Sequence, residues 1–230
     1  MIIEFSIYDI DLKEIEVRER ATKALTHNPQ YLSVYPFYLK SIKKIISSSP
    51  IKNETKISCP IDYPFGILDL KSRQAEIINS IKNGAEKIEI VFPTFFVANR
   101  KYDKLREDIT ENIKICKDNN IVLCYFLEYR LFDHQILLKV CEIMKDLGIN
   151  QVYSSTGHML DDINDNLIAS NYLSQKAGIS TIVNGNIWTE DQIKRILKTD
   201  VYGIRFNSLF SIDLFNQKFI KQRPSPTHTE

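Results

Sequence analysis

Eight short runs rich in β-branched and aromatic residues alternate with longer amphipathic stretches from one end of the sequence to the other. This alternation is typical of repeated βα units around a parallel sheet. The expected strands are Phe5 to Asp9, Tyr31 to Tyr35, Lys56 to Asp62, Ile88 to Phe92, Ile121 to Glu128, Gln151 to Ser154, Ser180 to Val183 and Tyr202 to Phe206. The expected helices cover residues 11–26, 37–48, 69–83, 100–118, 134–147, 161–177, 189–198 and 208–220. Because eight parallel strands can close on themselves, the pattern predicts an α/β fold of the (β/α)8 or TIM-barrel type.

Length and composition fit one such barrel. The chain has 230 residues, of which 43% are hydrophobic, and this is enough to bury a full-sized core. Glycine occurs only seven times, and no low-complexity stretch divides the sequence. We therefore expect a single TIM-barrel domain over residues 1–221, followed by a polar C-terminal tail over residues 222–230.

Charge and cysteine usage argue against several classes of partner. Thirty basic and twenty-nine acidic residues give a net charge of +1, which provides no global field for a nucleic acid or a membrane surface. The four cysteines show no CxxC spacing, and the first residues lack the features of a signal peptide. No apolar run approaches the roughly 20 residues that span a bilayer. We expect a soluble, cytoplasmic protein with reduced cysteines and with neither nucleic acid nor membrane as a partner.

A barrel of this type carries its chemistry at the carboxyl ends of its strands. Among the polar residues there, Glu89 is the most informative, because the alternation from Ile88 to Phe92 places it on the face opposite the isoleucines. We expect Glu89 to point into the barrel. A buried carboxylate is costly unless it is paired, so a functional role, a structural ion pair and a core group satisfied by water are all open.

Two turns could contribute backbone amides to an anion. The segment STGHM at 155–159 follows an expected strand and precedes an expected helix, an arrangement that could cradle phosphate. The segment NGN at 184–186 has the composition of a tight turn. Taken alone, each is more simply an ordinary turn.

Six spaced segments, read in order, resemble the deoxyribose-phosphate aldolase family from about Ile7 to Leu214. They are SVYPFYL at 33–39, YPFG at 63–66, NGAEKIEIVFP at 83–93, VLCYFLEYRL at 122–131, VYSSTG at 152–157 and IVNGNIWTEDQ at 182–192. The resemblance implies a cofactor-free enzyme that cleaves 2-deoxyribose 5-phosphate into glyceraldehyde 3-phosphate and acetaldehyde through a lysine Schiff base.

The sequence departs from the family where the covalent chemistry is done. By the same resemblance, Tyr153 stands in place of the Schiff-base lysine, and Ile182 replaces the second lysine that lowers its pKa. Glu89 replaces the catalytic aspartate, and Asp9 matches an aspartate of the proton relay. A Schiff base needs an unprotonated primary amine. Since neither tyrosine nor isoleucine can supply one, we expect the aldol mechanism to fail.

The phosphate end of the family's site is only partly matched. Gly157, Gly185 and Ser208 align with positions that line it, whereas Asn186 and Asn207 replace a glycine and a serine. The candidate ligand-binding residues are therefore Ser155, Thr156, Gly157, His158, Gly185, Asn186, Asn207 and Ser208.

Arg205 falls where the family's last strand has glycine. Three placements are open for its side chain: it could bind phosphate, fill the pocket, or lie outside the barrel if the strand register differs by one residue.

The leading interpretation is an aldolase-like barrel that has lost its catalysis and serves as a phosphometabolite-binding or interaction homologue. Its expected partner is a phosphorylated sugar or inorganic phosphate, and the family suggests a homodimer. One alternative is an enzyme in which Glu89, Tyr153 and His158 transfer protons on a related sugar phosphate. Another is residual aldolase activity, with Lys71 or Lys101 reaching the site. We expect no metal, because the histidines are scattered.

Overall fold

The structure of the protein is a computed structural model that describes residues 1–50, 54–159 and 162–220. The tail predicted at 222–230 lies outside the described residues, as does residue 161, where one helix was expected to begin. The extent of a single domain over 1–221 stays a prediction.

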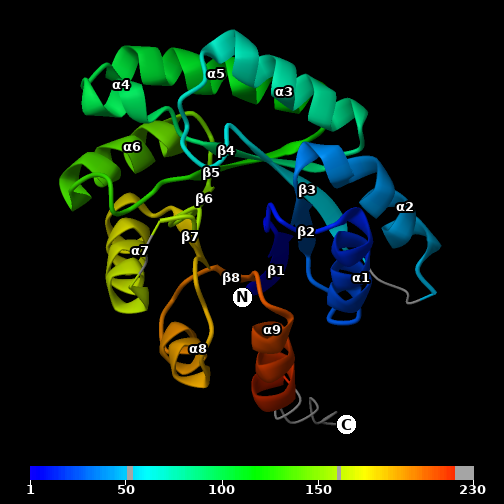
Figure 1. Cartoon of the computed structure of the whole chain (residues 1–230). Helices are drawn as coiled ribbons and strands as arrows, with labels where there is room; N and C mark the ends of the chain where they lie inside the picture. The colour runs from blue at the N-terminus through cyan, green and yellow to red at the C-terminus, as the bar shows by residue number, and fades with distance from the viewer. Residues whose placement is uncertain (51–53, 160–161, 221–230) are drawn as a thin grey trace, which may run out of the picture.

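Eight parallel strands form a closed barrel in the order of the sequence, and helices form an outer ring around it (Figure 1). The strands are β1 (Ile2–Ile7), β2 (Tyr31–Val34), β3 (Lys56–Ile61), β4 (Lys87–Val91), β5 (Val122–Phe126), β6 (Gln151–Tyr153), β7 (Ser180–Asn184) and β8 (Gly203–Phe206). The barrel closes between β1 and β8, where Glu4 pairs with Arg205. The predicted (β/α)8 fold is confirmed.

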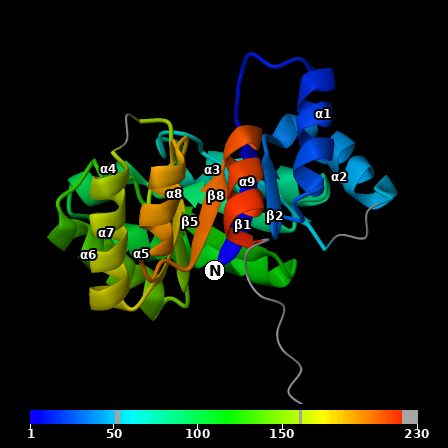
Figure 2. The same cartoon turned by 90° about the horizontal axis from the view of Figure 1, so that it is seen from below.

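The helices run alongside the strands, as the side view shows for α7, α8 and α9 (Figure 2). They are α1 (Glu14–Leu25), α2 (Leu39–Ser48), α3 (Leu70–Lys82), α4 (Thr94–Ala98), α5 (Tyr102–Asp118), α6 (His134–Asp146), α7 (Ile163–Ala177), α8 (Glu190–Leu197) and α9 (Leu209–Phe215). Side-chain oxygens of Asp69, Asp133 and Asp162 accept backbone hydrogen bonds at the starts of α3, α6 and α7, which explains where these helices begin. Among the described residues, no helix is both long enough and apolar enough to traverse a bilayer.

The structure differs from the sequence-based expectations in four elements. Strand β1 begins at Ile2, three residues earlier than expected, and this brings Glu4 into the sheet. A short helix, α4, lies within the segment expected to be a loop. A 3₁₀ turn at Pro36–Tyr38 precedes α2, and a π-helical turn at Asn216–Ile220 follows α9. Aromatic and β-branched residues in TFFVA conceal α4, because they favour strand on propensity alone.

Side chains on the two faces of the strands have different surroundings. Outward-facing residues pack with the helices in the main hydrophobic core. The interior has a much smaller apolar cluster, made of Val91, Cys124, Phe126, Tyr153 and Ile182. The remaining interior volume is filled largely by polar and charged side chains, and these determine what chemistry the barrel can support.

Candidate functional site

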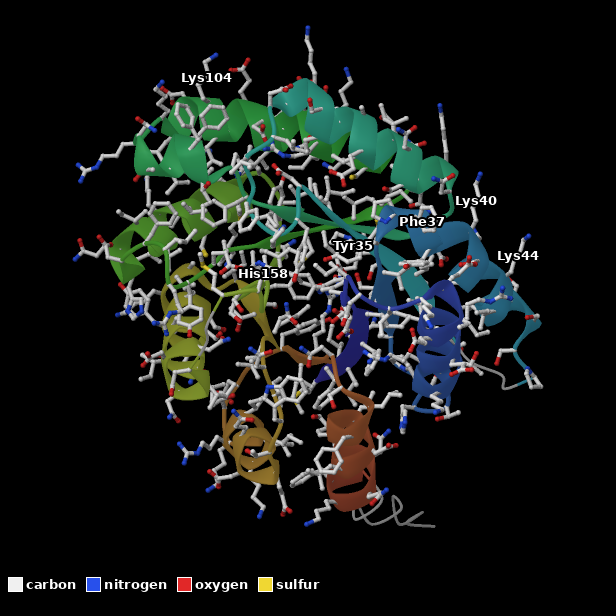
Figure 3. The ribbon with its side chains drawn as sticks, in the orientation of Figure 1. Tyr35, Phe37, Lys40, Lys44, Lys104 and His158 are labelled. Atoms are coloured by element: carbon white, nitrogen blue, oxygen red, sulfur yellow. The ribbon has the colours of Figure 1, made fainter. Side chains whose placement is uncertain are left out.

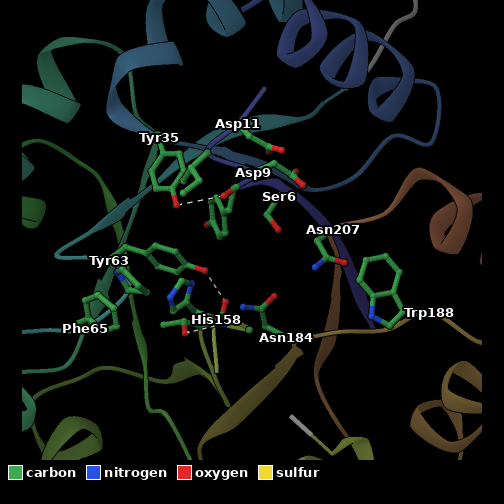
Figure 4. Close-up of a pocket in the computed structure, with 15 residues that line it drawn as sticks. Ser6, Asp9, Asp11, Tyr35, Tyr63, Phe65, His158, Asn184, Trp188 and Asn207 are labelled. Carbon is green, nitrogen blue, oxygen red and sulfur yellow. Dashed lines mark hydrogen bonds between the residues drawn. The ribbon is translucent and has the colours of Figure 1, made fainter. Parts of the chain in front are cut away.

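A pocket of about 720 Å³ opens at the carboxyl ends of the strands, among the loops that lead into the helices (Figure 4). Five aromatic rings line it, those of Tyr8, Tyr35, Tyr63, Phe65 and Trp188. This is where a barrel of this type carries its site, and the pocket is large enough for a sugar-sized molecule.

Five of the predicted site residues line this pocket, namely Asp9, Thr156, Gly157, His158 and Asn207. Ser155 and Gly185 lie behind the wall of the pocket. Ser155 is buried and donates a hydrogen bond to the carbonyl oxygen of Asn184 over 2.8 Å. Gly185 packs so closely on Gly157 that a Cβ atom at position 157 would lie 3.2 Å from the Cα atom of Gly185.

Two further predicted residues lie away from the described lining of the pocket. Asn186 presents its carbonyl oxygen to Gln192 at 3.4 Å. Ser208 precedes α9, and its side chain makes no capping hydrogen bond there. Nothing in these contacts brings either side chain to the pocket.

The amides of the segment 156–158 donate their hydrogen bonds within the protein. Thr156 N donates to the Glu128 carboxylate, Gly157 N to Ser155 Oγ over 3.1 Å, and His158 N to Thr156 Oγ1 over 3.2 Å. A phosphate cradle requires amides that are free to donate to the ligand. In this conformation the three amides have protein acceptors instead.

Four charged side chains meet inside the barrel beneath the pocket: Glu4, Lys87, Glu89 and Arg205, called here the buried charge cluster. Lys87 Nζ lies 2.8 Å from Glu4 Oε1. Arg205 Nη2 lies 2.6 Å from Glu4 Oε2, and Arg205 Nη1 lies 2.7 Å from Glu89 Oε2. All four residues are 0% exposed. Two positive and two negative charges leave the cluster neutral, which makes its burial tolerable.

Arg205 therefore fills the barrel interior, and the suggestion that it lies outside the barrel is wrong. Its guanidinium donates to Glu4, Glu89, Tyr8 and Tyr153. A guanidinium has five N–H donors, and these contacts engage all three of its nitrogens. Arg205 is thus not available as a phosphate ligand in this conformation.

Tyr153 completes the buried charge cluster from β6. Its hydroxyl lies 2.6 Å from Glu4 Oε2 and 2.9 Å from Glu89 Oε1, and its ring stacks on Phe126 with centroids 4.6 Å apart. Burial raises the pKa of Tyr153 well above its ordinary value, although Arg205 opposes this. The side chain is a neutral phenol that fills space and bridges two carboxylates.

Glu89 points into the barrel, as the sequence predicted. Its carboxylate accepts hydrogen bonds from Arg205, from Tyr153, and from the Tyr8 and Ser33 hydroxyls at 3.0 Å each. Burial alone would raise the pKa of Glu89, but the charge and hydrogen bonds of Arg205, together with the charge of Lys87, lower the pKa to about 2. A carboxylate this acidic is a weak general base near neutral pH.

Lys87 is the lysine of the buried charge cluster. Its ammonium group lies between the rings of Tyr31 and Tyr153, 4.3 Å and 4.9 Å from their centroids. Burial would lower the pKa of Lys87, but the negative charges around it, first that of Glu4 and then that of Glu89, together hold the pKa above its usual value. Lys87 begins β4, two residues before Glu89. It is therefore the member of the buried charge cluster that lies deeper in the barrel than Glu89, farther from the pocket.

The other lysines considered lie on the surface. Lys71 and Lys101 are exposed, and Lys101 Nζ rests over the ring of Phe95, 5.2 Å from its centroid. Figure 3 shows Tyr35 and His158 near the centre of the barrel, with Lys40, Lys44 and Lys104 directed outward. Of the described residues that line the pocket, none is a lysine or an arginine.

Asp9 lies at the pocket rim and not in the buried charge cluster. Its carboxylate pairs with Arg20 at 2.7 Å, and both side chains are partly exposed. Within the described part of the chain, no group of three or more His, Cys, Asp or Glu side chains is arranged to hold a metal ion.

A second buried ion pair positions the loop between β3 and α3, which carries Tyr63 and Phe65 into the pocket. Arg73 Nη2 lies 3.0 Å from Asp62 Oδ2, and Arg73 also pairs with Asp108. Asp62 Oδ1 in turn accepts the backbone N–H of Ile67 at 2.9 Å. Arg73 thus holds one wall of the pocket from behind.

Sequence reasoning missed Glu4 and Lys87, because both expected strands were started one residue too late to include them. The pattern did contain a signal. Glu4 shares the parity of Ser6 along β1, and Lys87 shares that of Glu89 along β4, so each pair faces the same side of its strand.

No family model matches the chain. Among curated proteins, it is 25% identical to a deoxyribose-phosphate aldolase of Clostridium tetani over 155 residues, which is 67% of this chain and 69% of that protein. It is 30% identical to a deoxyribose-phosphate aldolase of Mannheimia succiniciproducens over 128 residues, 56% of this chain and 54% of that protein.

Solved structures share the fold. The aldolase QR15 superposes with a TM-score of 0.79 at 19% identity, covering 97% of both chains. The tetrameric deoxyribose phosphate aldolase of Aeropyrum pernix superposes with a TM-score of 0.81 at 18% identity, covering 95% of this chain and 90% of that one. The resemblance to curated deoxyribose-phosphate aldolases is confirmed at this low identity, and the fold is shared with solved aldolase structures.

Proposed function

We propose that this protein is an aldolase-like barrel that binds a small, hydroxyl-rich metabolite in the pocket and forms no Schiff base with it. One observation carries the proposal. At the position where the family resemblance expects a Schiff-base lysine, the neutral phenol of Tyr153 bridges Glu4 and Glu89.

Schiff-base chemistry requires an amine that is unprotonated and can reach the ligand. The nearest candidate, Lys87, is paired with Glu4, and its pKa is raised. It is also separated from the pocket by the layer that contains Glu89 and Arg205. Both the protonation state and the position of Lys87 therefore support binding without imine formation.

A proton-transfer enzyme has weaker support. Its proposed base, Glu89, has a pKa of about 2 and accepts hydrogen bonds from four side chains. Its proposed acid, Tyr153, has a pKa well above the usual value because it is buried. Both groups would have to leave the buried charge cluster before they could exchange a proton with a ligand.

The experiment that tests this proposal combines two measurements on one sample. A coupled assay follows glyceraldehyde 3-phosphate release from 2-deoxyribose 5-phosphate, and a thermal-shift titration follows binding of sugars and their phosphates. We expect a rise in Tm with a sugar and no turnover above the background of a heat-denatured sample. Turnover above that background would contradict the proposal, and its loss in Lys87→Met, with the fold retained, would assign the reactive amine to Lys87.

A further inference from the structure

Three neutral side chains form the floor of the pocket. Asn184 ends β7, Asn207 directly follows β8, and Ser6 lies in β1. These three strands are neighbours in the closed barrel. Strand register pairs Phe5 with Phe206 and Asn184 with Arg205. Ser6 and Asn207 each lie two residues beyond a member of the buried charge cluster, Glu4 and Arg205. Figure 4 shows the three side chains facing the pocket.

These side chains have hydrogen-bonding capacity that the protein does not use. Oδ1 of Asn207 is buried and has no hydrogen-bond partner. Ser6 Oγ also has none among the described residues, although Ser6 is only 2% exposed. Asn184 donates from Nδ2 to Ser155 O at 2.9 Å, which leaves its Oδ1 as an acceptor. Buried polar atoms are nearly always paired, so the unpaired Oδ1 of Asn207, together with the unused hydrogen-bonding capacity of Ser6 and Asn184, points to a ligand that carries several donors and acceptors.

The walls of the pocket supply flat apolar faces. Tyr63 and Trp188 line it, and the Tyr63 hydroxyl is held by Thr156 O at 2.8 Å. Burial raises the pKa of Tyr63, so its phenol is uncharged near neutral pH. Aromatic faces with a few fixed polar groups are common in small-molecule sites, and they suit a ring with an apolar face and hydroxyl edges.

No lysine or arginine is among the described residues that line the pocket, and His158 is the basic side chain found there. The lining also includes two carboxylates, Asp9 and Asp11. The amides of residues 156–158 donate within the protein, and Arg205 is engaged by Glu4 and Glu89. A phosphate brought into such a site loses hydration without gaining charge-assisted hydrogen bonds from a lysine or an arginine.

We infer that the pocket recognises a neutral, hydroxyl-rich ligand, an unphosphorylated sugar or polyol, through Ser6, Asn184 and Asn207, and that it discriminates against phosphorylated ligands. The inference rests on the proposed binding function and adds the ligand's charge. It departs from the partner that the sequence resemblance suggests, a phosphorylated sugar or inorganic phosphate.

Isothermal titration of the full chain with 2-deoxyribose, ribose, 2-deoxyribose 5-phosphate and inorganic phosphate tests this preference at low salt. We expect a free sugar to bind in the millimolar range, as is common for ligands with few atoms, and at least about tenfold more tightly than its phosphate ester, a difference of about 1.4 kcal/mol. Tighter binding of the ester or of phosphate would overturn the inference. So would the absence of binding by both free sugars.

Two variants sharpen the test. Asn207→Ala should weaken sugar binding by about tenfold or more, because a carboxamide that contacts the ligand is lost. Asn119→Ala, at the exposed C-cap that follows α5, should leave it unchanged. Asp11→Lys should strengthen binding of the phosphate ester more than that of the free sugar, because it replaces a carboxylate of the lining with an ammonium group. Equal effects of Asn207→Ala and Asn119→Ala would overturn the assignment of the floor residues.

The failure of this inference can be told apart from the failure of the proposed function. Preference for the ester without turnover overturns only the neutral-ligand inference. Turnover of 2-deoxyribose 5-phosphate overturns the proposed function, whichever sugar binds more tightly.

Discussion

Arg205 enters the barrel from β8 and contacts both carboxylates of the buried charge cluster. A lone buried carboxylate would be expected to take up a proton, because burial disfavours its charged form. Here the guanidinium keeps Glu89 ionised, with a pKa of about 2. One side chain thus converts a potential general base into a structural anion, and two predictions follow at the residue scale.

Arg205→Leu should destabilise the fold strongly. Removing one partner from a buried ionic group costs about 3–5 kcal/mol, because Glu4 and Glu89 would be left with only Lys87 as a counter-charge. Urea unfolding measures the change. The matched control is Arg20→Leu, which removes the partly exposed pair with Asp9 and should cost about 1 kcal/mol or less. Similar losses in the two variants would contradict the role given to Arg205.

Acid should destabilise the protein partly through Glu89. Its pKa in the folded state is about 2, below the ordinary value of 4.5. The stability that it contributes is therefore present above about pH 4.5 and is lost as the pH falls toward about 2. The unfolding free energy should fall more steeply over this range in the native protein than in Glu89→Gln, and exposed Glu142→Gln should behave like the native protein. Equal slopes for the native protein and Glu89→Gln would contradict this.

At the scale of elements, the loop between β3 and α3 is shaped from behind by a buried ion pair. Asp62, at the end of β3, accepts the amides of Ile67 and Leu68 and pairs with Arg73 of α3. Loops are usually the mobile parts of a barrel. This one is fixed at both ends, so Tyr63 is presented to the pocket in a defined position.

Arg73→Leu should loosen that loop and weaken ligand binding. Hydrogen exchange at the amides of Ile67 and Leu68 should accelerate, because Asp62 loses its counter-charge. Exchange monitored by mass spectrometry or NMR reports this directly. Lys71→Leu changes an exposed residue on the same helix and serves as the control. Unchanged exchange in Arg73→Leu would mean that Asp62 holds the loop without help.

Sequence periodicity predicted the barrel strands well, because each strand combines β-branched residues with a turn signal at its end. The chemistry inside the barrel was harder to predict. Glu89 was identified, but Glu4 and Lys87 were missed because charged residues at strand starts look like loop residues. Pairing across the barrel is also invisible locally: Glu4 and Arg205 are 201 positions apart in sequence, and only strand closure makes them neighbours.

At the scale of the whole molecule, the fold and the side chains of the barrel interior lead to different conclusions about function. The fold is shared with aldolases that are below 20% identical to this chain, and a shared fold does not fix function. The interior contains a neutral charge cluster, and the described lining of the pocket contains no lysine. A homodimer, suggested by the family resemblance, stays a prediction that sedimentation can check.

The most direct test of whether this barrel forms an imine is borohydride trapping. The full chain is incubated with 2-deoxyribose 5-phosphate and reduced with sodium borohydride, and its intact mass is then measured by mass spectrometry. A sample without the sugar serves as the control. We predict no stoichiometric adduct, because no lysine lines the described pocket and Lys87 is protonated and paired with Glu4. One adduct per chain, mapped by peptide analysis to a single lysine such as Lys87, would contradict the central claim.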